Sequence, residues 1–268
     1  MKKLLAFLLV VLLTASFCAC SKEEGETDLD QYKQNEKVIT SVTNDQGETF
    51  YFDSIDSETV ILLSYIGPDT PHALIIPATL NEKSVAAIGE MAFNNCSSIS
   101  SISFPASVTS IGEYAFACCA TLTSLSIPET VTSIGKGAFS ACSALTAVTF
   151  AENNKITEIS DFTFFKCTAL TAVNVPGSVK VIGDGAFYGC SALTSATFAE
   201  GIQLLGSQLL QSCEKLSSLT LPASVTSIGS FAFSGCPALY RDKITCPAGS
   251  KAETYVNAMK LSNTPAEE

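Results

Sequence analysis

Residues 122–142 read LTSLSIPETVTSIGKGAFSAC, and this stretch and its variants occur seven times along the chain. Successive copies are 23 residues apart, except for one step of 25. A fixed period of this size predicts a solenoid, because each repeat buries its apolar face only against its neighbours. The Ile-Gly pair of the stretch, or its variant, begins at Ile88, Ile111, Ile134, Ile159, Ile182, Leu205 and Ile228.

The first half of each repeat predicts a β-strand. Leu125 and Ile127 point to one face of such a strand, and Ser124 and Ser126 point to the other. Pro128 follows, where the missing N–H costs least. We therefore expect a sheet with one apolar face and one face of small polar residues.

The second half of each repeat predicts a corner and a core column. Gly135 permits a tight corner, and 138–142 predict a turn of α- or 3₁₀-helix that directs Phe139 inward. Equivalent side chains then stack along the core at Phe93, Phe116, Phe139, Phe164, Phe187, Leu210 and Phe233. The predicted fold is a β-rich α/β solenoid of about seven 23-residue repeats, with a cap at each end.

A cysteine stands eight residues after each Ile or Leu of the pair, at Cys96, Cys119, Cys142, Cys167, Cys190, Cys213 and Cys236. This column has three possible states, which are disulfides, a thiolate metal site and buried free thiols. Equivalent side chains of stacked coils point in parallel, and seven is an odd number. The C-x-x-C spacing of a zinc site is absent. We therefore predict buried free thiols and no bound metal.

The first twenty residues predict an export signal with a lipid anchor. Lys2 and Lys3 precede an apolar run at 4–13, and Cys20 follows an alanine. This resembles a bacterial lipoprotein signal, in which the cysteine after the cleavage site becomes diacylated. Cys18 is the other candidate cysteine, and an ordinary secretory signal is the alternative. Two acyl chains are enough for stable attachment to a bilayer.

Composition divides the chain into five parts. They are a signal at 1–20, a disordered acidic tether at 21–36, a β-rich N-terminal cap at 37–87, the solenoid at 88–240, and a C-terminal cap and tail at 241–268. Strands are expected in the N-terminal cap at 49–52, 59–66 and 73–76, a last strand at 244–245, and a covering helix at 252–259.

The charge and the residue types argue against two classes of function. Lys plus Arg number 15 and Asp plus Glu number 26, which gives a net charge of −11. Removal of Lys2 and Lys3 with the signal would leave about −13, from 13 minus 26. Such acidity argues against binding nucleic acid. The single histidine, His72, is expected in a surface loop, and no catalytic or phosphate-binding motif is present. We therefore predict no enzyme and no cofactor.

The repeated unit L-x-x-L-x-I-P-x-x-V-x-x-I-G-x-x-A-F-x-x-C resembles the BspA-like class of bacterial leucine-rich repeats, over about Leu74 to Met259. The resemblance implies a right-handed leucine-rich-repeat superhelix in a secreted or surface-attached protein. It also implies adhesion or protein binding. The expected partner is an extracellular or envelope protein, from the host matrix or from another cell surface. That family shares no catalytic residues, so the resemblance carries none to this chain.

The sequence offers one edge of the solenoid for such a partner. The outer sheet face has no Trp, and the only Arg, Arg241, lies outside the repeats. Larger side chains gather after the glycine corner, and the candidate partner-binding residues are Tyr114, Phe162, Phe165, Tyr188 and Phe231. The cap loop at 65–72 is a second candidate, and rings half-buried against their own repeat are the alternative. A glycan-binding accessory lipoprotein and a purely structural surface spacer remain the other possible functions.

Overall fold

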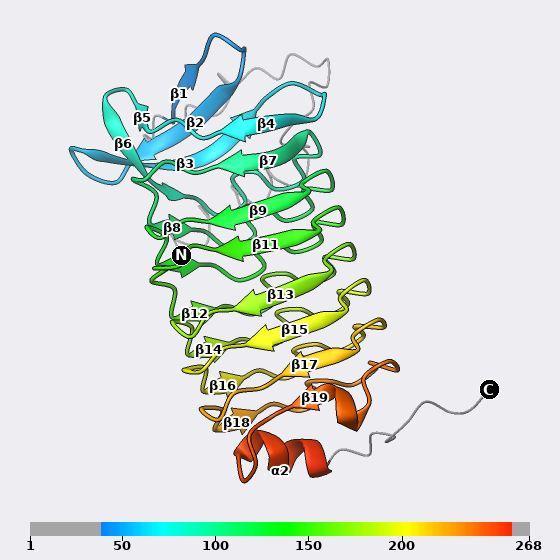
Figure 1. Ribbon diagram of the computed structural model, residues 1–268. Coiled ribbons are helices and arrows are strands. Elements are labelled where there is room, and N and C mark those ends of the chain that lie inside the picture. The colour runs from blue at the N-terminus through cyan, green and yellow to red at the C-terminus, as the bar shows by residue number, and fades with distance from the viewer. Residues whose placement is uncertain (1–38, 259–268) are drawn as a thin grey trace, which may run out of the picture.

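The computed structural model describes residues 39–258, which form a solenoid of stacked coils (Figure 1). The chain advances along the stack from the N-terminal cap to helix α2. The predicted lipoprotein signal with Cys20, and the predicted tether at 21–36, lie outside the described residues. The final residues, 259–268, also lie outside them.

One wall of the solenoid is a parallel sheet, the main sheet, to which each repeat gives one strand. Ala147 pairs with Ser124 and Val148 with Leu125, so equivalent positions of neighbouring repeats lie side by side. The six hydrogen-bonded strands, in spatial order, are β19 (Ile244–Thr245), β17 (Ser218–Thr220), β15 (Ser195–Phe198), β13 (Ala172–Val175), β11 (Ala147–Phe150) and β9 (Ser124–Ile127). The same wall continues to β7 (Ile99–Ser103) and β4 (His72–Ile75), which pair with each other (Figure 1).

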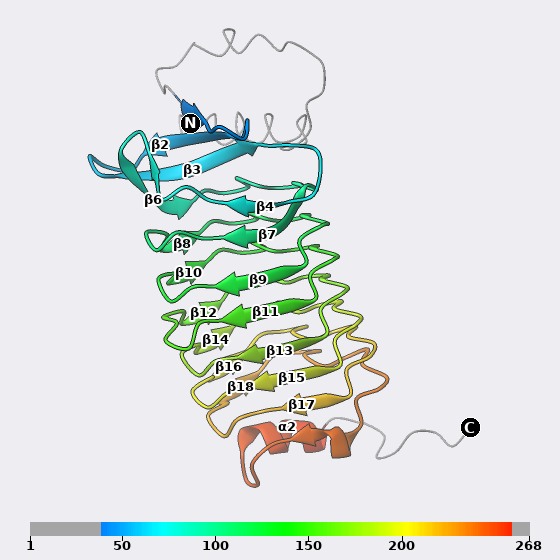
Figure 2. The ribbon, with the colours of Figure 1, turned by 45° about the horizontal axis from the view of Figure 1, so that its top comes forward.

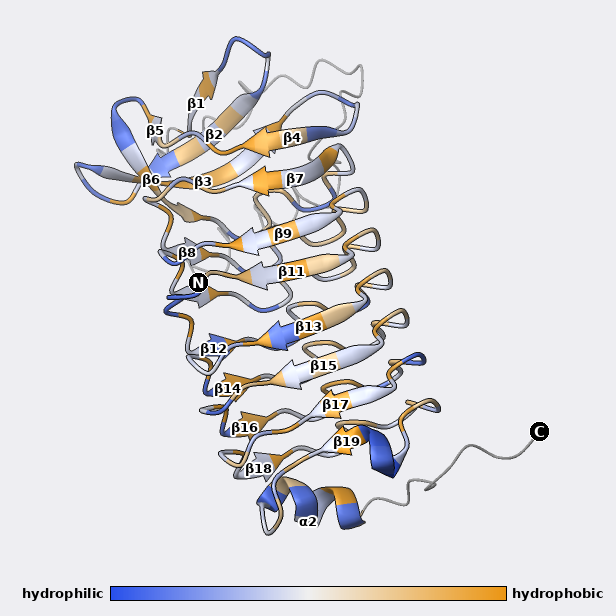
Figure 3. Cartoon of the chain, in the orientation of Figure 1, coloured by the Kyte–Doolittle hydropathy of each residue, from blue (hydrophilic) through white to orange (hydrophobic). Residues whose placement is uncertain are grey.

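The predicted alternation along the strands is confirmed. In β9, Leu125 and Ile127 are buried, whereas Ser124 and Ser126 are exposed. Figure 3 shows the same mixture of apolar and polar residues along the strands of the main sheet. The buried faces of the strands form one side of the core.

The opposite wall consists mainly of two-residue strands, one per repeat. They are β8 (Ser110–Ile111), β10 (Ser133–Ile134), β12 (Glu158–Ile159), β14 (Val181–Ile182), β16 (Leu204–Leu205) and β18 (Ser227–Ile228). The hydrogen-bonded sheet divides between β10 and β12. This is the place where the repeat step lengthens from 23 to 25 residues.

The N-terminal cap combines a hairpin with the first coils. Its further strands are β1 (Thr40–Thr43), β2 (Thr49–Ser54), β3 (Thr59–Ile66), β5 (Thr79–Leu80) and β6 (Lys83–Ile88). β1, β2 and β3 pair antiparallel, whereas β3 pairs with β6 in parallel. The strands expected in the cap are therefore present, and parallel stacking begins inside it.

The corner after each short strand is not helical, so the predicted helical turns are wrong. Ala138 N donates to Gly135 O at 3.2 Å and Ser140 N donates to Gly137 O at 2.9 Å, which are successive β-turns. Gly137 and Ala141 have positive φ angles of 61° and 57°. A left-handed residue every fourth position ends each turn before a helix can extend.

The core contains the predicted column of rings. Phe139 is fully buried and lies 5.4 Å from Phe116 and 5.7 Å from Phe164, with nearly parallel planes. Leu210 takes the place of one ring and is also fully buried. The column therefore fills the space between the two walls along the repeats.

The predicted helix over the C-terminal end is α2 (Lys251–Ala258), which lies against the last coil (Figure 2). Ala252 and Val256 are buried, as their spacing of four residues requires. The Tyr255 hydroxyl donates to Gly229 O at 3.2 Å. α2 therefore covers apolar surface that the last repeat would otherwise expose.

Candidate functional site

The outer face of the main sheet is a hydroxyl-rich surface. Ser126, Thr149 and Asn174 are exposed there, as expected. At the start of the strands, hydroxyl groups donate to the carbonyl one repeat earlier, from Ser100 to His72, Thr123 to Ser100, Thr146 to Thr123, Thr171 to Thr146, Thr194 to Thr171 and Ser217 to Thr194. We call this series the hydroxyl ladder. Because each hydroxyl donates to a backbone carbonyl of the preceding coil, the ladder links neighbouring repeats.

Three of the five candidate aromatic residues occupy a column of left-handed backbone positions. Tyr114, Phe162 and Phe231 have φ angles of 51°, 56° and 59°. Gly137 and Gly185 take the same position in other repeats, with φ angles of 61° and 57°. Positive φ is uncommon for large side chains, because the Cβ approaches the backbone. The stacked turns of the solenoid hold the aromatic residues in this conformation.

The structure brings three of the five candidates together. Phe162 contacts Phe165 edge to face, with ring centroids 5.8 Å apart. Phe165 stacks on Tyr188 at 5.2 Å. All three rings are half-buried. They form a continuous aromatic surface across two neighbouring repeats.

Two lysines lie over these rings. Lys136 Nζ is 5.6 Å from the centroid of Phe162, and Lys166 Nζ is 5.2 Å from that of Phe165. Within residues 39–258, neither ammonium group forms an ion pair. We define the aromatic ledge as Lys136, Phe162, Phe165, Lys166 and Tyr188. It places two lysine side chains beside three aromatic rings on a protein whose net charge is −11.

Among the described residues, the other two candidates make no ring contact with the ledge. Tyr114 is half-buried, and its ring lies over Gly137 of the following repeat. Phe231 is 66% exposed, and in the described part of the chain its ring contacts no other ring. The sequence identified the rings of the ledge, but it did not identify Lys136 and Lys166 as their neighbours.

The cysteine column consists of thiols that bond to the backbone. Cys142 Sγ donates to Phe116 O at 3.2 Å, and the same bond recurs in Cys119, Cys167, Cys190, Cys213 and Cys236. These six cysteines are free and buried, as predicted. The prediction is wrong for Cys96, which is disulfide-bonded. Burial raises the pKa of Cys119 and of Cys190 to about 12 and that of Cys236 to about 11, so these thiols stay neutral and unreactive.

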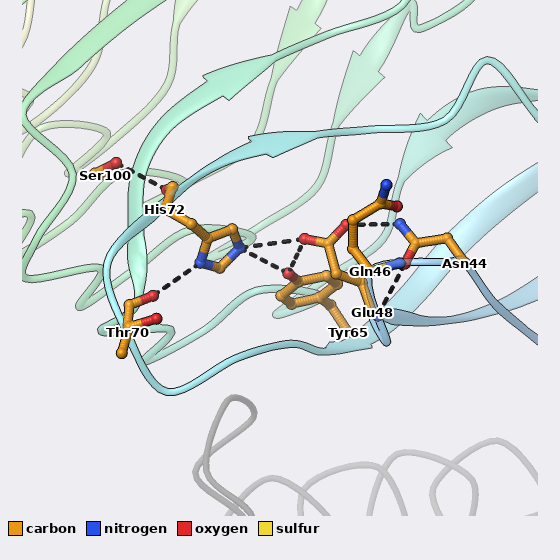
Figure 4. Close-up of polar contacts among 7 residues, drawn as sticks. All are labelled: Asn44, Gln46, Glu48, Tyr65, Thr70, His72 and Ser100. Atoms are coloured by element: carbon orange, nitrogen blue, oxygen red, sulfur yellow. Dashed lines mark hydrogen bonds and ion pairs between the residues drawn. The ribbon is translucent and has the colours of Figure 1, made fainter.

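The cap loop is built differently from the sequence-based expectation. Tyr65 is fully buried and therefore offers no contact area to a partner. His72 is not in a surface loop but begins β4, and its ring joins a polar cluster with Tyr65 and Glu48 (Figure 4). The loop between them, 68–71, is exposed. Nothing in the sequence pattern indicated this cluster, because the cap does not repeat.

The described residues show neither a metal-ligand cluster nor a membrane span. Within 39–258, no group of three or more His, Cys, Asp or Glu side chains is arranged to hold a metal ion. No helix in that part of the chain has the length and apolar character needed to cross a bilayer.

Comparisons with known proteins agree with this fold. Residues 75–168 and 157–258 match the family described as BspA type Leucine rich repeat region, in six copies. The chain is similar to the Leucine Rich Repeat protein of T. pallidum, with 26% identity, a TM-score of 0.65, and coverage of 87% of this chain and 99% of that one. It is also similar to a leucine rich cell surface protein from Faecalibacterium prausnitzii, with 24% identity, a TM-score of 0.43 and 79% of each chain covered. No curated protein matches the chain.

Proposed function

The chain belongs to the BspA-type leucine-rich-repeat family, and from this premise we propose that it is a lipid-anchored, surface-exposed protein of the bacterial envelope that binds another protein. Leucine-rich-repeat solenoids of this type are a general protein-interaction fold. The proposed role is adhesion through an extended, rigid surface. Catalysis is not part of the proposal.

The aromatic ledge is the observation that carries this proposal. Aromatic side chains bury a large area at low entropic cost, and partner-binding surfaces are enriched in them. Phe162, Phe165 and Tyr188 are held in place by ring contacts with one another. Lys136 and Lys166 add two charged groups that form no ion pair with a described carboxylate. Anchors that are rigid before binding lose little freedom on association.

The arrangement of the rings favours a protein partner over a glycan. A sugar ring binds by stacking on an open aromatic face. In the ledge, Tyr188 already stacks on Phe165, and Lys166 lies over the same ring. Lys136 lies over Phe162. The ring edges and the ammonium groups therefore form the accessible part of the ledge, and these suit apolar and acidic groups of a protein.

The proposed location rests on the first twenty residues alone. A positively charged start, an apolar run and Cys20 together favour export and diacylation. Two acyl chains would hold the protein on a bilayer without a membrane-spanning helix. The solenoid would then project from the membrane on the segment that precedes β1.

Site-specific crosslinking tests the proposed function. A photoreactive phenylalanine analogue would replace Phe165 of the ledge in one variant and Ser126 of the main sheet in a matched control. Cells carrying each variant would be exposed to host matrix proteins and to envelope extracts. We expect a specific protein adduct from position 165 and none from position 126.

The partner identified by crosslinking is then used in affinity measurements, which test the role of the ledge in binding. The double variant Phe165→Ala, Tyr188→Ala should weaken binding at least about tenfold, and the exposed control pair Ser126→Ala, Thr149→Ala should leave it unchanged. Adducts only from position 126 would move the binding surface to the main sheet. Binding to glycans but to no protein would favour the accessory-lipoprotein alternative, and binding to neither would favour a structural spacer.

A further inference from the structure

Three polar atoms meet in the N-terminal cap, at the first strand of the main sheet (Figure 4). Tyr65 Oη lies 2.6 Å from Glu48 Oε1 and 2.9 Å from His72 Nε2. His72 Nε2 lies 3.2 Å from the same Glu48 oxygen. Tyr65 is fully buried, and Glu48 is only 7% exposed. We call these three side chains the cap triad.

The remaining polar atoms of the triad have fixed roles. His72 Nδ1 lies 3.0 Å from Thr70 O. A carbonyl oxygen only accepts, so Nδ1 must carry a proton. Glu48 Oε2 accepts from Asn44 Nδ2 at 2.7 Å, and the Glu48 backbone N–H donates to Asn44 Oδ1. Only the protons among the three meeting atoms are left to assign.

A single proton shared by these three atoms is too few to make all three contacts attractive. The Tyr65 hydroxyl has a single proton and donates it to Glu48. Burial, together with the hydrogen bond to Glu48, raises the pKa of Tyr65 well above its ordinary value, so the hydroxyl keeps this proton. An unprotonated His72 Nε2 would then face lone pairs on both oxygen neighbours. Acceptors that face one another without a proton are costly at a position largely shielded from water.

We infer that the cap triad holds a second proton, on His72 Nε2, and that the N-terminal cap is therefore a pH-responsive clasp. The charged ring donates to Tyr65 Oη and forms an ion pair with Glu48 Oε1, and Tyr65 donates to Glu48. All three contacts are then attractive. The imidazolium and the carboxylate compensate each other's charge in the buried site.

The second proton belongs on the imidazole and not on Glu48. An ordinary imidazole binds a proton more tightly than an ordinary carboxylate, by about two pH units. Both carboxylate oxygens of Glu48 already accept a hydrogen bond, Oε2 from Asn44 Nδ2 and Oε1 from Tyr65 Oη. Among the described residues, Glu48 and Tyr65 are the titratable groups that contact the His72 ring.

The number of protons in the triad determines how the stability of the cap changes with pH. The clasp is complete while His72 Nε2 carries its proton, and its contribution is lost when that proton leaves at higher pH. The triad joins the segment before β2 to the end of β3 and the start of β4. His72 O also accepts the first bond of the hydroxyl ladder, from Ser100 at 2.8 Å. Opening the clasp therefore loosens the end of the main sheet.

Hydrogen exchange on the full chain tests the inference. Peptides covering 66–76 would be compared at pH 5.5 and pH 8.0 after correction for the intrinsic exchange rates. We expect protection of β4 to fall about tenfold at the higher pH, while β13 and β15 stay unchanged. The variants His72→Gln and Glu48→Gln should each remove the difference. Equal protection at both pH values in the wild type, or a difference that persists in His72→Gln, would overturn the inference.

A second measurement does not depend on either variant folding. The chain has one histidine, so its ring nitrogen signals can be assigned without ambiguity by NMR. We expect a charged ring at pH 6.0, with a slowly exchanging Nε2 proton. A neutral ring that carries a proton only on Nδ1 at that pH would contradict the second proton directly.

Discussion

The ring of Phe162 lies over Gly185 of the following repeat, so that a methyl group added at Gly185 would come within 2.6 Å of Phe162 Cε1. Tyr114 and Gly137 show the same relationship, with a corresponding distance of 2.3 Å. Neighbouring strands of a sheet are about 4.8 Å apart, so a ring that lies across the next coil needs a neighbour without a side chain. The glycine one repeat after each of these rings is therefore favoured for two reasons: it leaves space for the ring, and it adopts a positive φ.

The first prediction follows from this contact. Gly185→Ala should lower the free energy of unfolding by about 2–3 kcal/mol, from a left-handed alanine and displacement of the Phe162 ring. Gly249→Ala is the matched control, because Gly249 has a φ of 75° but nothing within 4 Å of an added methyl group. The control should cost about 1 kcal/mol. Urea unfolding checks both values, and equal losses would show that the ring does not oppose the methyl group.

The second prediction concerns the column of rings. Phe139→Ala should cost about 3–5 kcal/mol, because it removes a fully buried ring between two others. Phe139→Leu should cost much less, since Leu210 already occupies the equivalent position. Denaturant unfolding of the two variants measures the difference. A loss below about 1 kcal/mol for Phe139→Ala would be inconsistent with a closely packed column.

The third prediction is a loss of stability in alkali. Burial raises the pKa of Cys190 from 9.0 to about 12. Below about pH 9 the folded and unfolded chains both keep this proton, so the neutral thiol contributes in full. Between about pH 9 and 12 the unfolded chain loses the proton and the folded chain keeps it. The free energy of unfolding should therefore fall by up to about 1.4 kcal/mol per pH unit for each such thiol.

The variant Cys190→Ala measures how much of this alkaline loss of stability comes from one cysteine. Cys190→Ala removes one titrating thiol and should lose less stability than the wild type between about pH 8 and pH 10.5. Urea midpoints at the two pH values give the comparison. Parallel losses in the two proteins would assign the alkaline effect to other groups.

The fourth prediction concerns the proposed anchor. Cys20→Ser should abolish incorporation of a labelled fatty acid and release the protein from the membrane fraction, because the diacylated residue is missing. Cys18→Ser is the matched control and should label normally. The opposite pattern would place the lipid on Cys18, and labelling in neither the wild type nor the variants would support an ordinary secretory signal.

The candidate site was predictable only in part. The offset of three residues from Phe162 to Phe165, and of 23 from Phe165 to Tyr188, placed those rings near one another once the period was known. The positions of Lys136 and Lys166 over the rings depend on side-chain conformations, which a repeat pattern does not specify. The role of these residues in binding stays a prediction. The cap triad joins residues 17 and 7 positions apart in a segment without a repeat, so no spacing indicated it.

The sequence by itself determined the solenoid, the two faces of its strands, and the columns of rings and cysteines. These follow from the period, because equivalent residues of neighbouring coils must contact one another wherever the chain advances by a constant step. Only the tertiary structure decided that the corners are β-turns, with residues such as Tyr114 and Phe162 at positive φ. Local propensity disfavours that conformation, and hydrogen bonds to the next coil, such as Phe162 N to Asp184 O at 2.9 Å, stabilise it. The cap triad was likewise decided by contacts outside the period, where neither spacing nor propensity carries information.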